Sequence, residues 1–289
     1  MDQNLLKKIE LTINDRIVNS RSISGGCISD AMLLITESGK KYFLKVNNTQ
    51  PEDMFIKEAN GLRELSIANT IRIPHVIFVH SNYILLEAIE SGTRIKNFFE
   101  DFGRRFAEMH KFTSDQFGFY ENNYIGSTPQ INIPQQNEAN NWTEFYFNKR
   151  ILFQYELAVK NGYGDSTLKS LIKKLENKIP EILKGSDEPP CLLHGDLWGG
   201  NYIVDENGEA CLIDPAVYYG HREADLAMTK LFGGFSSEFY KAYNEFYPLP
   251  DGYDYRENIY KLYHVMNHLN LFGTGYYNQT ISLLKFYVD

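Results

Sequence analysis

The residues best suited to chemistry lie in the segment HGDLWGGN, residues 194–201, and in the segment IDP, residues 213–215. Asp196 is followed by Asn201 five positions later and by Asp214 thirteen positions after that. Transfer of a phosphoryl group from a nucleotide needs such groups in this order. One carboxylate orients the attacking hydroxyl and accepts its proton, while an amide oxygen and a second carboxylate hold metal ions on the phosphates. Each residue alone also fits a loop or a strand end, so the ordered set carries the interpretation.

The same spacing occurs in the kinase signature H-x-D-L…N followed by D-x-G, which here reads HGDL…N and then DPA. We therefore interpret Asp196 as the catalytic base. Asn201 and Asp214 are interpreted as ligands of Mg²⁺, which prefers a few protein oxygens plus phosphate. His194 is expected to brace the loop through hydrogen bonds, and Asp225 to brace the catalytic core.

The sequence leaves no room for a long activation segment. Position 195 is Gly, where protein kinases usually have the Arg that responds to a phosphorylated activation loop. Only eight residues separate Asp214 from Glu223. We therefore expect activity that does not depend on phosphorylation of the enzyme.

A second group of candidate residues lies in the first part of the chain. Gly25 and Gly26 separate two predicted strands, and glycine allows backbone to approach a phosphate closely, although an ordinary hairpin turn fits them too. Lys45 lies on the return strand between Leu44 and Val46, where an inward-pointing ammonium needs a partner. Glu58 lies thirteen residues later on the predicted helix. Such a Lys–Glu pair holds the Lys on the phosphates in kinases.

Backbone groups and aromatic rings complete the candidate site. Glu87, Ala88 and Ile89 end an apolar strand, and their main chain is placed to read an adenine edge. Trp198 lies two residues past Asp196, where its ring could stack on a sugar or fill the core. His221 could face the substrate or serve in structural hydrogen bonds.

The elements that must position these residues form two parts that meet near residue 89. Alternating apolar residues predict strands within 17–47, 76–79 and 83–88, and an apolar stripe predicts a helix that begins at Pro51. We expect helices over 98–111, 142–160, 166–183, 223–232, 236–247, 254–272 and 278–287, with a long irregular connection over 113–141. This predicts a nucleotide-binding lobe, 1–89, and a helical lobe, 90–289, with a ligand site between them.

Composition limits the classes of partner. The 289 residues are 43% hydrophobic and 23% charged, which is ordinary for a globular protein. The net charge of −8 argues against non-specific binding to nucleic acid or to anionic membranes. No apolar run approaches the ~20 residues of a membrane span. Three sparse cysteines give no disulfide or metal pattern, so we expect a reduced, cytoplasmic protein.

Several segments together resemble the fructosamine-3-kinase and ketosamine-3-kinase family. They are HGDLW-x-GN, IDPA, YYGHRE-x-DLA, LFGGF, SGGCIS, FLKVN, the Phe117-Gly118-Phe119 element and Pro129-Gln130. The resemblance runs from about Ser24 to the C-terminal helices. HGDLW together with DPA and YGHRE is specific for this family within the wider aminoglycoside and choline kinase group. Position 199 is a departure, since the family commonly has Ser there and this chain has Gly.

The resemblance implies an α+β, protein-kinase-like bilobal fold with a small antiparallel-sheet N-lobe and a larger helical C-lobe. It implies ATP- and Mg²⁺-dependent phosphorylation of the sugar 3-hydroxyl of ketosamines, which are sugar adducts of small amines or protein lysines, and hence a role in deglycation repair. It also implies the same roles for Asp196, Asn201, Asp214, the Lys45–Glu58 pair and the linker at 87–89. Cys27, in the glycine-rich loop, fits either a redox-sensitive thiol or a small strand residue.

Two other functions compete with this interpretation. One is a kinase for another hydroxyl, such as that of an aminoglycoside or choline, which the family-specific segments disfavour. The other is a pseudokinase scaffold, which has no need to keep the full set of charged residues. The preferred sugar adduct, the choice between free and protein-bound lysine, and the oligomeric state are not fixed by the sequence.

Overall fold

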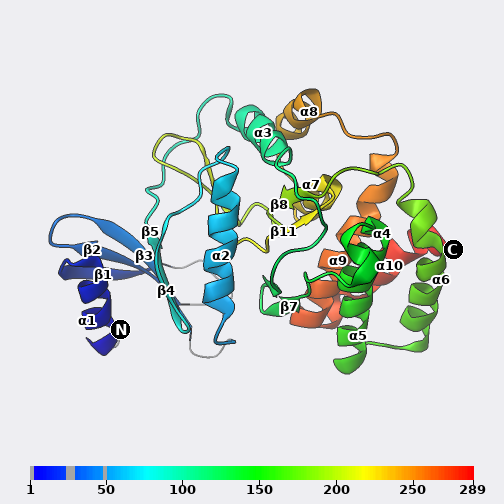
Figure 1. Ribbon diagram of the computed structural model, residues 1–289, viewed down its shortest axis with the longest axis horizontal. Coiled ribbons are helices and arrows are strands. Elements are labelled where there is room, and N and C mark those ends of the chain that lie inside the picture. The colour runs from blue at the N-terminus through cyan, green and yellow to red at the C-terminus, as the bar shows by residue number, and fades with distance from the viewer. Residues whose placement is uncertain (1–2, 24–29, 48–50) are drawn as a thin grey trace.

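The computed structural model describes residues 3–23, 30–47 and 51–289, which form an elongated molecule with a sheet at one end and helices at the other (Figure 1). Five antiparallel strands have the spatial order β1-β2-β3-β5-β4. Their bounds are β1 (Ile17–Ile23), β2 (Asp30–Thr36), β3 (Lys41–Val46), β4 (Val76–His80) and β5 (Tyr83–Glu87). The predicted strands are thereby confirmed. Gly25, Gly26 and Cys27 lie outside the described residues.

Each face of this sheet is covered by one helix. Strand β5 shows the alternation that this requires, because Leu85 joins the small core under α1 (Gln3–Ile13) whereas Ile84 and Leu86 join the main core. Helix α1 was not among the predicted elements. It packs through Leu5, Ile9 and Ile13, a four-residue spacing that places them on one side of the helix.

Helix α2 (Met54–Ile67) packs on the main-core side of the sheet through Phe55, Ala59, Leu62 and Leu65. The predicted helix is confirmed, but its start at Pro51 is wrong. The chain forms a turn before Met54, in which the Met54 N–H donates to the Pro51 carbonyl over 3.1 Å. Figure 1 shows α2 between the sheet and the helical part, so one helix borders both.

The remaining chain is mainly helical, as predicted. Its helices are α3 (Phe98–Met109), α4 (Trp142–Tyr146), α5 (Phe153–Lys160), α6 (Ser166–Ile182), α7 (Arg222–Leu231), α8 (Ser237–Phe246), α9 (Tyr253–Phe272) and α10 (Tyr277–Val288). A π-helical segment, η2 (Phe147–Leu152), joins α4 to α5, so the helix expected over 142–160 is continuous but not α-helical throughout. A short 3₁₀ turn, η3 (Thr274–Tyr276), precedes α10.

Two short antiparallel strand pairs in the helical part position the candidate site. Strands β8 (Cys191–Leu193) and β11 (Tyr218–Gly220) pair with each other, as do β9 (Tyr202–Val204) and β10 (Ala210–Leu212). Residues 194–201 therefore form the loop between β8 and β9, and Asp214 follows β10. The connection at 113–141 contains a small hairpin of β6 (Asn123–Ile125) and β7 (Thr128–Gln130) and a 3₁₀ turn, η1 (Gln136–Ala139).

The linker after β5 is tied to the β9–β10 hairpin. Arg72 lies between the parts, and its guanidinium contacts Glu87 at 2.7 Å, Asp205 at 3.0 Å and Glu206 at 2.7 Å. The Gly92 N–H donates to the Val204 carbonyl over 3.0 Å. A Cβ at position 92 would lie 2.1 Å from the Asp205 carbonyl oxygen, so this approach requires glycine.

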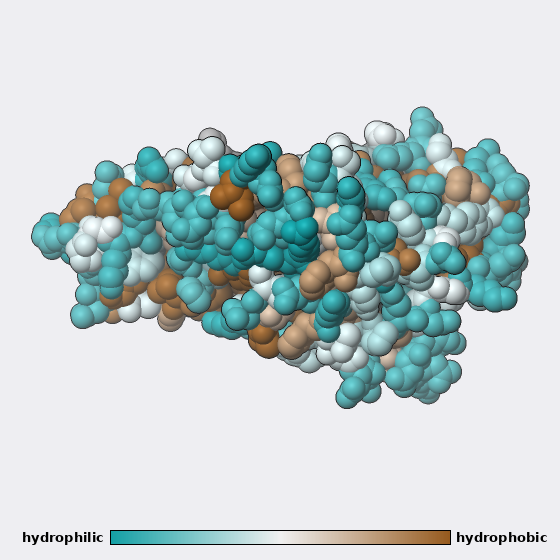
Figure 2. All heavy atoms as spheres, turned by 90° about the horizontal axis from the view of Figure 1, so that it is seen from above, coloured by the Kyte–Doolittle hydropathy of each residue, from teal (hydrophilic) through white to brown (hydrophobic). Residues whose placement is uncertain are grey.

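The face seen from above is mainly hydrophilic, with apolar residues in small groups (Figure 2). Among the described residues, no helix combines the length and apolar character needed to cross a membrane.

Candidate active site

The loop that carries Asp196 has a backbone shape that glycine alone fits comfortably. Gly195 has a φ of +81°, and a Cβ there would lie 2.0 Å from the carbonyl oxygen of Ala216. The loop is therefore pressed against the segment that follows Asp214, and the Ala216 N–H donates to the His194 carbonyl over 2.9 Å. Gly at position 195, where protein kinases usually have Arg, thus has a steric reason in this chain.

Asp225, on α7, fixes the loop that carries Asp196 by accepting two backbone hydrogen bonds from it. One carboxylate oxygen accepts the His194 N–H at 2.7 Å and the other accepts the Gly195 N–H at 2.8 Å. The first oxygen also lies 3.3 Å from His110 Nε2. Burial by itself raises the pKa of Asp225, but the hydrogen bonds from His110 and from the Gly195 N–H hold it below its ordinary value. The bracing role predicted for Asp225 is confirmed.

His194 is buried and bonds within the loop. Its Nε2 lies 3.0 Å from the Ile213 carbonyl, and its Nδ1 accepts the Asp196 N–H over 3.3 Å. Burial lowers the pKa of His194, which favours the neutral ring. The ring joins the loop to the chain that carries Asp214, so the bracing role expected of His194 is confirmed.

Asn201 holds Asp196 in place. Its side-chain Nδ2 donates to the Asp196 carbonyl over 2.7 Å and to Asp196 Oδ2 over 3.1 Å. Burial raises the pKa of Asp196 well above its ordinary value, although the bond from Asn201 opposes this shift. A raised pKa strengthens the carboxylate as a proton acceptor. Because the amide nitrogen is used on Asp196, the amide oxygen is the atom that remains to face a cation.

Lys45, on strand β3, pairs with Glu58 of α2 and with Asp214, and so connects the sheet to the segment after β10. Its Nζ contacts Glu58 Oε1 at 2.7 Å and also contacts Asp214 Oδ1. Burial by itself lowers the pKa of Lys45, but Asp214 and Glu58 more than offset it, so the pKa lies above its ordinary value. Burial raises the pKa of Glu58, while Lys45 acts in the opposite direction. The predicted Lys–Glu pair is present, and Asp214 belongs to the same group.

The oxygen atoms at this site suit a hard cation that is shared with phosphate. Asp214 has a left-handed φ of 55°, and its side chain is 44% exposed. Within the described ranges, no group of three or more His, Cys, Asp and Glu side chains is arranged to hold a metal. The residues that could hold such an ion are Asp214, through its carboxylate, and Asn201, through its amide oxygen. These are fewer ligands than Mg²⁺ takes, so phosphate oxygens and waters would have to complete the set.

An open pocket of about 610 Å³ lies between the first strands and the linker. It is lined by Arg21, Ser22, Ile23, Leu33, Lys41, Ala88, Ile89, Glu90 and Ser91. Ala88 and Ile89 thus border this space, and their part in binding adenine stays a prediction. The Glu87 side chain does not line this space. It bonds Arg72 and accepts the His75 N–H over 3.1 Å. Lys45 is not among the lining residues.

The two aromatic candidates have different environments. Trp198 is 39% exposed, and its ring meets Phe232 edge-on with centroids 6.0 Å apart. His221 is 3% exposed and stacks on Trp142 with centroids 4.6 Å apart. Burial lowers the pKa of His221 to about 3. The structure therefore places His221 in the core as a packing residue and leaves Trp198 at the surface.

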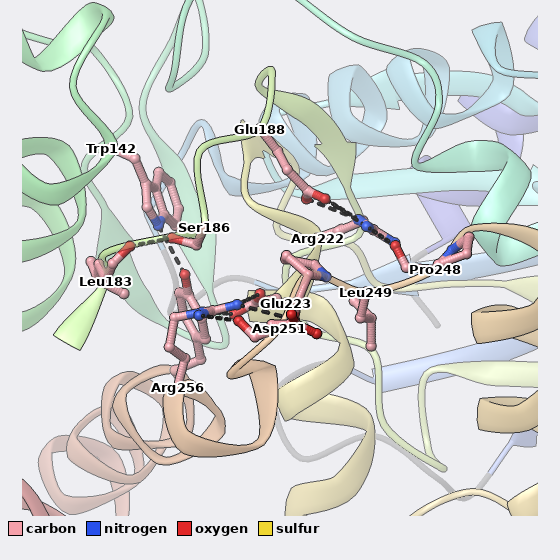
Figure 3. A network of polar contacts seen from close by, with 12 residues as sticks. Trp142, Leu183, Ser186, Glu188, Arg222, Glu223, Pro248, Leu249, Asp251 and Arg256 are labelled. Atoms are coloured by element: carbon pink, nitrogen blue, oxygen red, sulfur yellow. Dashed lines mark hydrogen bonds and ion pairs between the residues drawn. The ribbon is translucent and has the colours of Figure 1, made fainter.

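The two charged residues that follow His221 belong to a network of ion pairs, which Figure 3 shows. Arg222 donates to Glu188, with Nε 2.9 Å from Oε2, and Arg256 donates to Glu223 through Nε over 2.8 Å. Arg222 and Glu223 begin α7 and are buried. Both ion pairs therefore fix the start of the helix that carries Asp225.

Sequence reasoning missed the ring beside Trp198, which is that of Phe232, and the His268 ring that packs on Phe232 in turn. Phe232 follows α7, and its centroid lies 4.7 Å from that of His268 on α9. The available signal was the LFGGF segment, residues 231–235, which contributes to the family resemblance but shows no local periodicity. The proximity of α9 could not be read from the sequence pattern.

The chain combines an antiparallel sheet that carries a Lys–Glu pair with a later loop that carries Asp196 and Asn201. This combination is that of a phosphotransferase with a protein-kinase-like fold. The streptomycin–ATP ternary complex of the aminoglycoside phosphotransferase APH(2")-IIa shares this fold, with a TM-score of 0.65 at 17% identity over 99% of this chain and 96% of that one. More narrowly, the chain belongs to the fructosamine kinase family, whose family model matches residues 1–289.

Two relatives illustrate the similarity. The chloroplastic protein-ribulosamine 3-kinase of Oryza sativa subsp. indica is 40% identical over 280 residues, covering 94% of this chain and 80% of that protein. A solved structure from Thermobifida fusca, assigned as a fructosamine-3-kinase, has a TM-score of 0.89 at 27% identity and covers 99% of both chains.

Proposed function

We propose that this protein transfers the γ-phosphoryl group of ATP to the 3-hydroxyl of a ketosamine. As a member of the fructosamine kinase family it is an ATP-dependent kinase. One observation carries the assignment of the site. Asn201 holds the half-buried carboxylate of Asp196, while Asp214, which follows the neighbouring strand, contacts the Lys45–Glu58 pair.

In this proposal Asp196 accepts the proton of the attacking hydroxyl. Its raised pKa favours proton transfer, and Asn201 fixes the orientation of its Oδ2. Lys45, held by Glu58, binds the phosphates of ATP. Asp214 and the Asn201 amide oxygen would hold Mg²⁺, which neutralises phosphate charge when it is bound. The main chain of Glu87, Ala88 and Ile89 would bind adenine, and Gly25 and Gly26, which lie outside the described residues, are proposed from the sequence alone as the phosphate loop.

The acceptor is proposed to be a ketosamine on a small amine or on a protein lysine. Trp198 and Phe232 offer exposed ring surface on the loop side of the site, and an aromatic ring can cover the apolar face of a sugar. Phosphorylation of such adducts would give the protein a role in deglycation repair. Of the two roles considered for His221, its buried environment argues against a substrate contact, so we do not include it in the substrate site.

The remaining assignments concern organisation and location. We propose residues 1–89 as the nucleotide-binding lobe and residues 90–289 as the lobe that carries the catalytic loop and the substrate site. Cys191 and Cys211 are buried free thiols, which suits a reducing cytoplasm. The net charge of −8 gives no support for binding to nucleic acid.

The test compares acceptors and follows the site of phosphorylation. Fructosyl-lysine, ribulosyl-lysine, choline and kanamycin are incubated with ATP and Mg²⁺, and the product is located by phosphorus NMR. We expect turnover with a ketosamine and phosphate on the 3-oxygen. The Asp196→Asn variant should lose turnover but keep affinity for ATP, whereas a change at the exposed Asp187, Asp187→Asn, should alter neither. Phosphate on another oxygen, preference for choline or kanamycin, or an active Asp196→Asn variant would refute the proposal.

A further inference from the structure

Helix α2 carries a polar stripe beside Glu58. Asp53, at the helix start, is followed on the same side by Lys57, Asn60 and Glu64, with spacings of four, three and four residues. The apolar residues of α2 face the main core, and Glu58 reaches Lys45. The polar stripe therefore has to find its partners away from the sheet.

All four stripe residues bond to the helical part of the protein. Glu121 accepts from Lys57 Nζ over 2.7 Å and from Asn60 Nδ2 over 2.9 Å. Tyr124 donates its hydroxyl to Asp53 over 2.6 Å. Tyr219, on β11, donates to Glu64 over 2.7 Å. The side chains of Lys57 and Glu121 are only 21% and 15% exposed, so water screens this pair incompletely.

Residues 117–132, which we call the clamp segment, contain Glu121 and Tyr124 and are fixed to the chain that follows Asp214. Buried Asn123 donates to the Val217 carbonyl over 2.8 Å, and buried Gln130 donates to the Ala216 carbonyl over 2.9 Å. The clamp segment is therefore attached to the backbone that Gly195 also contacts.

Two further contacts join the same elements. Gly118 exchanges two backbone hydrogen bonds with Tyr219, of 2.9 and 2.7 Å. A Cβ added to Gly61 of α2 would lie 3.4 Å from side-chain atoms of both Pro215 and Val217. Helix α2 thus rests directly on the segment after Asp214, while the clamp segment holds its polar side.

These contacts fix the rotation of α2 about its axis and its position along that axis. Lys57 and Glu58 are neighbours on α2, and their side chains point in directions about 100° apart around the helix axis. Because the helix turns as one body, a rotation that separates Lys57 from Glu121 also turns Glu58 away from Lys45. In protein kinases the equivalent Lys–Glu pair is controlled by phosphorylation of the activation loop. Here only eight residues separate Asp214 from Glu223, which leaves no room for a long activation loop. The clamp segment holds the polar side of α2 instead.

We propose that Glu121 is a positioning residue for phosphoryl transfer. Together with Tyr124 it holds α2 in the orientation in which Glu58 meets Lys45, so the nucleotide site is assembled without modification of the enzyme. The inference rests on the proposed function only in that Lys45 binds the phosphates of ATP. It assigns a role to residues 117–119 and 129–130, which contribute to the family resemblance but to none of the catalytic roles.

The first measurement is the affinity of the full chain for ATP with Mg²⁺, by calorimetry and without an acceptor. Glu121→Gln keeps the shape of the side chain but removes its charge, and we expect about tenfold weaker binding, the size of one partly screened, charge-assisted hydrogen bond. Tyr124→Phe should weaken binding in the same direction. Glu138→Gln is the matched control, because Glu138 lies in the same connection and pairs with Lys149 at 3.1 Å. It should change ATP affinity by less than about twofold.

The second measurement shows whether Glu121 acts through Glu58. Glu58→Gln alone should weaken ATP binding, and adding Glu121→Gln to it should have an effect of less than about twofold, because the pair that Glu121 positions is already lost. Multiplicative effects of the two changes, unaltered ATP affinity in Glu121→Gln, or an equal loss in Glu138→Gln would overturn the proposal. ATP binding is measured separately from turnover. If Glu121 and Glu58 are coupled in ATP binding but no ketosamine is phosphorylated, the acceptor assignment is refuted and the role of Glu121 is kept.

Discussion

The Asp225→Asn variant tests whether one buried carboxylate organises the catalytic loop. Asp225 is 1% exposed, and its two oxygens accept separate backbone N–H groups, from His194 at 2.7 Å and from Gly195 at 2.8 Å. Asparagine has nearly the same shape but only one acceptor oxygen. The NH₂ of asparagine is a hydrogen-bond donor, so it would face one of the two backbone N–H groups without accepting from it.

The magnitude follows from these contacts. A hydrogen bond to a charged group contributes about 1.5–3 kcal/mol, and a buried donor left without an acceptor costs about 1–3 kcal/mol more. We therefore expect Asp225→Asn to lower the free energy of unfolding by about 3–5 kcal/mol. For a chain of this size, about 2 °C of Tm is lost per kcal/mol, so Tm should fall by roughly 6–10 °C. The turnover number should also fall, because the backbone next to Asp196 loses a support.

The assay is urea and thermal unfolding of both proteins at neutral pH, with Asp187→Asn as an exposed control. The pKa of Asp225 is lowered in the folded state, so its stabilisation is present above the ordinary carboxyl pKa and is lost as pH falls through the lower folded value. The stability difference between wild type and Asp225→Asn should therefore shrink in acid. A variant within about 1 kcal/mol of wild type at pH 7, with unchanged turnover, would refute the reasoning.

Two other predictions concern the same loop. Gly195→Ala places a Cβ 2.0 Å from the Ala216 carbonyl oxygen at a φ of +81°, so we expect lower Tm and a loss of at least about tenfold in kcat, and a variant with normal kcat would contradict the geometry. Burial raises the pKa of Asp196, and the base must be ionised, so kcat/KM should rise with pH through a midpoint above about 4, the ordinary value. A pH–rate profile that stays flat down to that value would exclude Asp196 as the base.

The local motifs predicted the parts of the site that depend on order along the chain. Asp196 and Asp214 follow strands β8 and β10, and Asn201 immediately precedes β9. The short loops leave few positions for a side chain, so the spacing of these residues in sequence limits their spacing in the fold. The Lys45–Glu58 pair was predicted for a different reason, since a Lys on an apolar strand must find a partner. Both inferences use constraints that act over a few residues or one helix–strand contact.

Other features depend on contacts between distant segments and left no local signal. The sequence left His221 open between a substrate contact and a structural role, and in the structure Trp142 and Phe117 pack against its ring. Glu87 ends its strand at the linker, yet its carboxylate bonds Arg72. Nothing in a polar connection of 29 residues marked Glu121 as the partner of Lys57, which lies 64 positions earlier.

The position of α2 has a consequence for how the protein unfolds. Its apolar side belongs to the same continuous core as residues of α9 and α10, and its polar side is bonded to the clamp segment and to β11. A peptide that ended at residue 89 would expose both sides of this helix to water. We therefore expect the two proposed lobes to unfold as one cooperative unit, with a single calorimetric transition on heating.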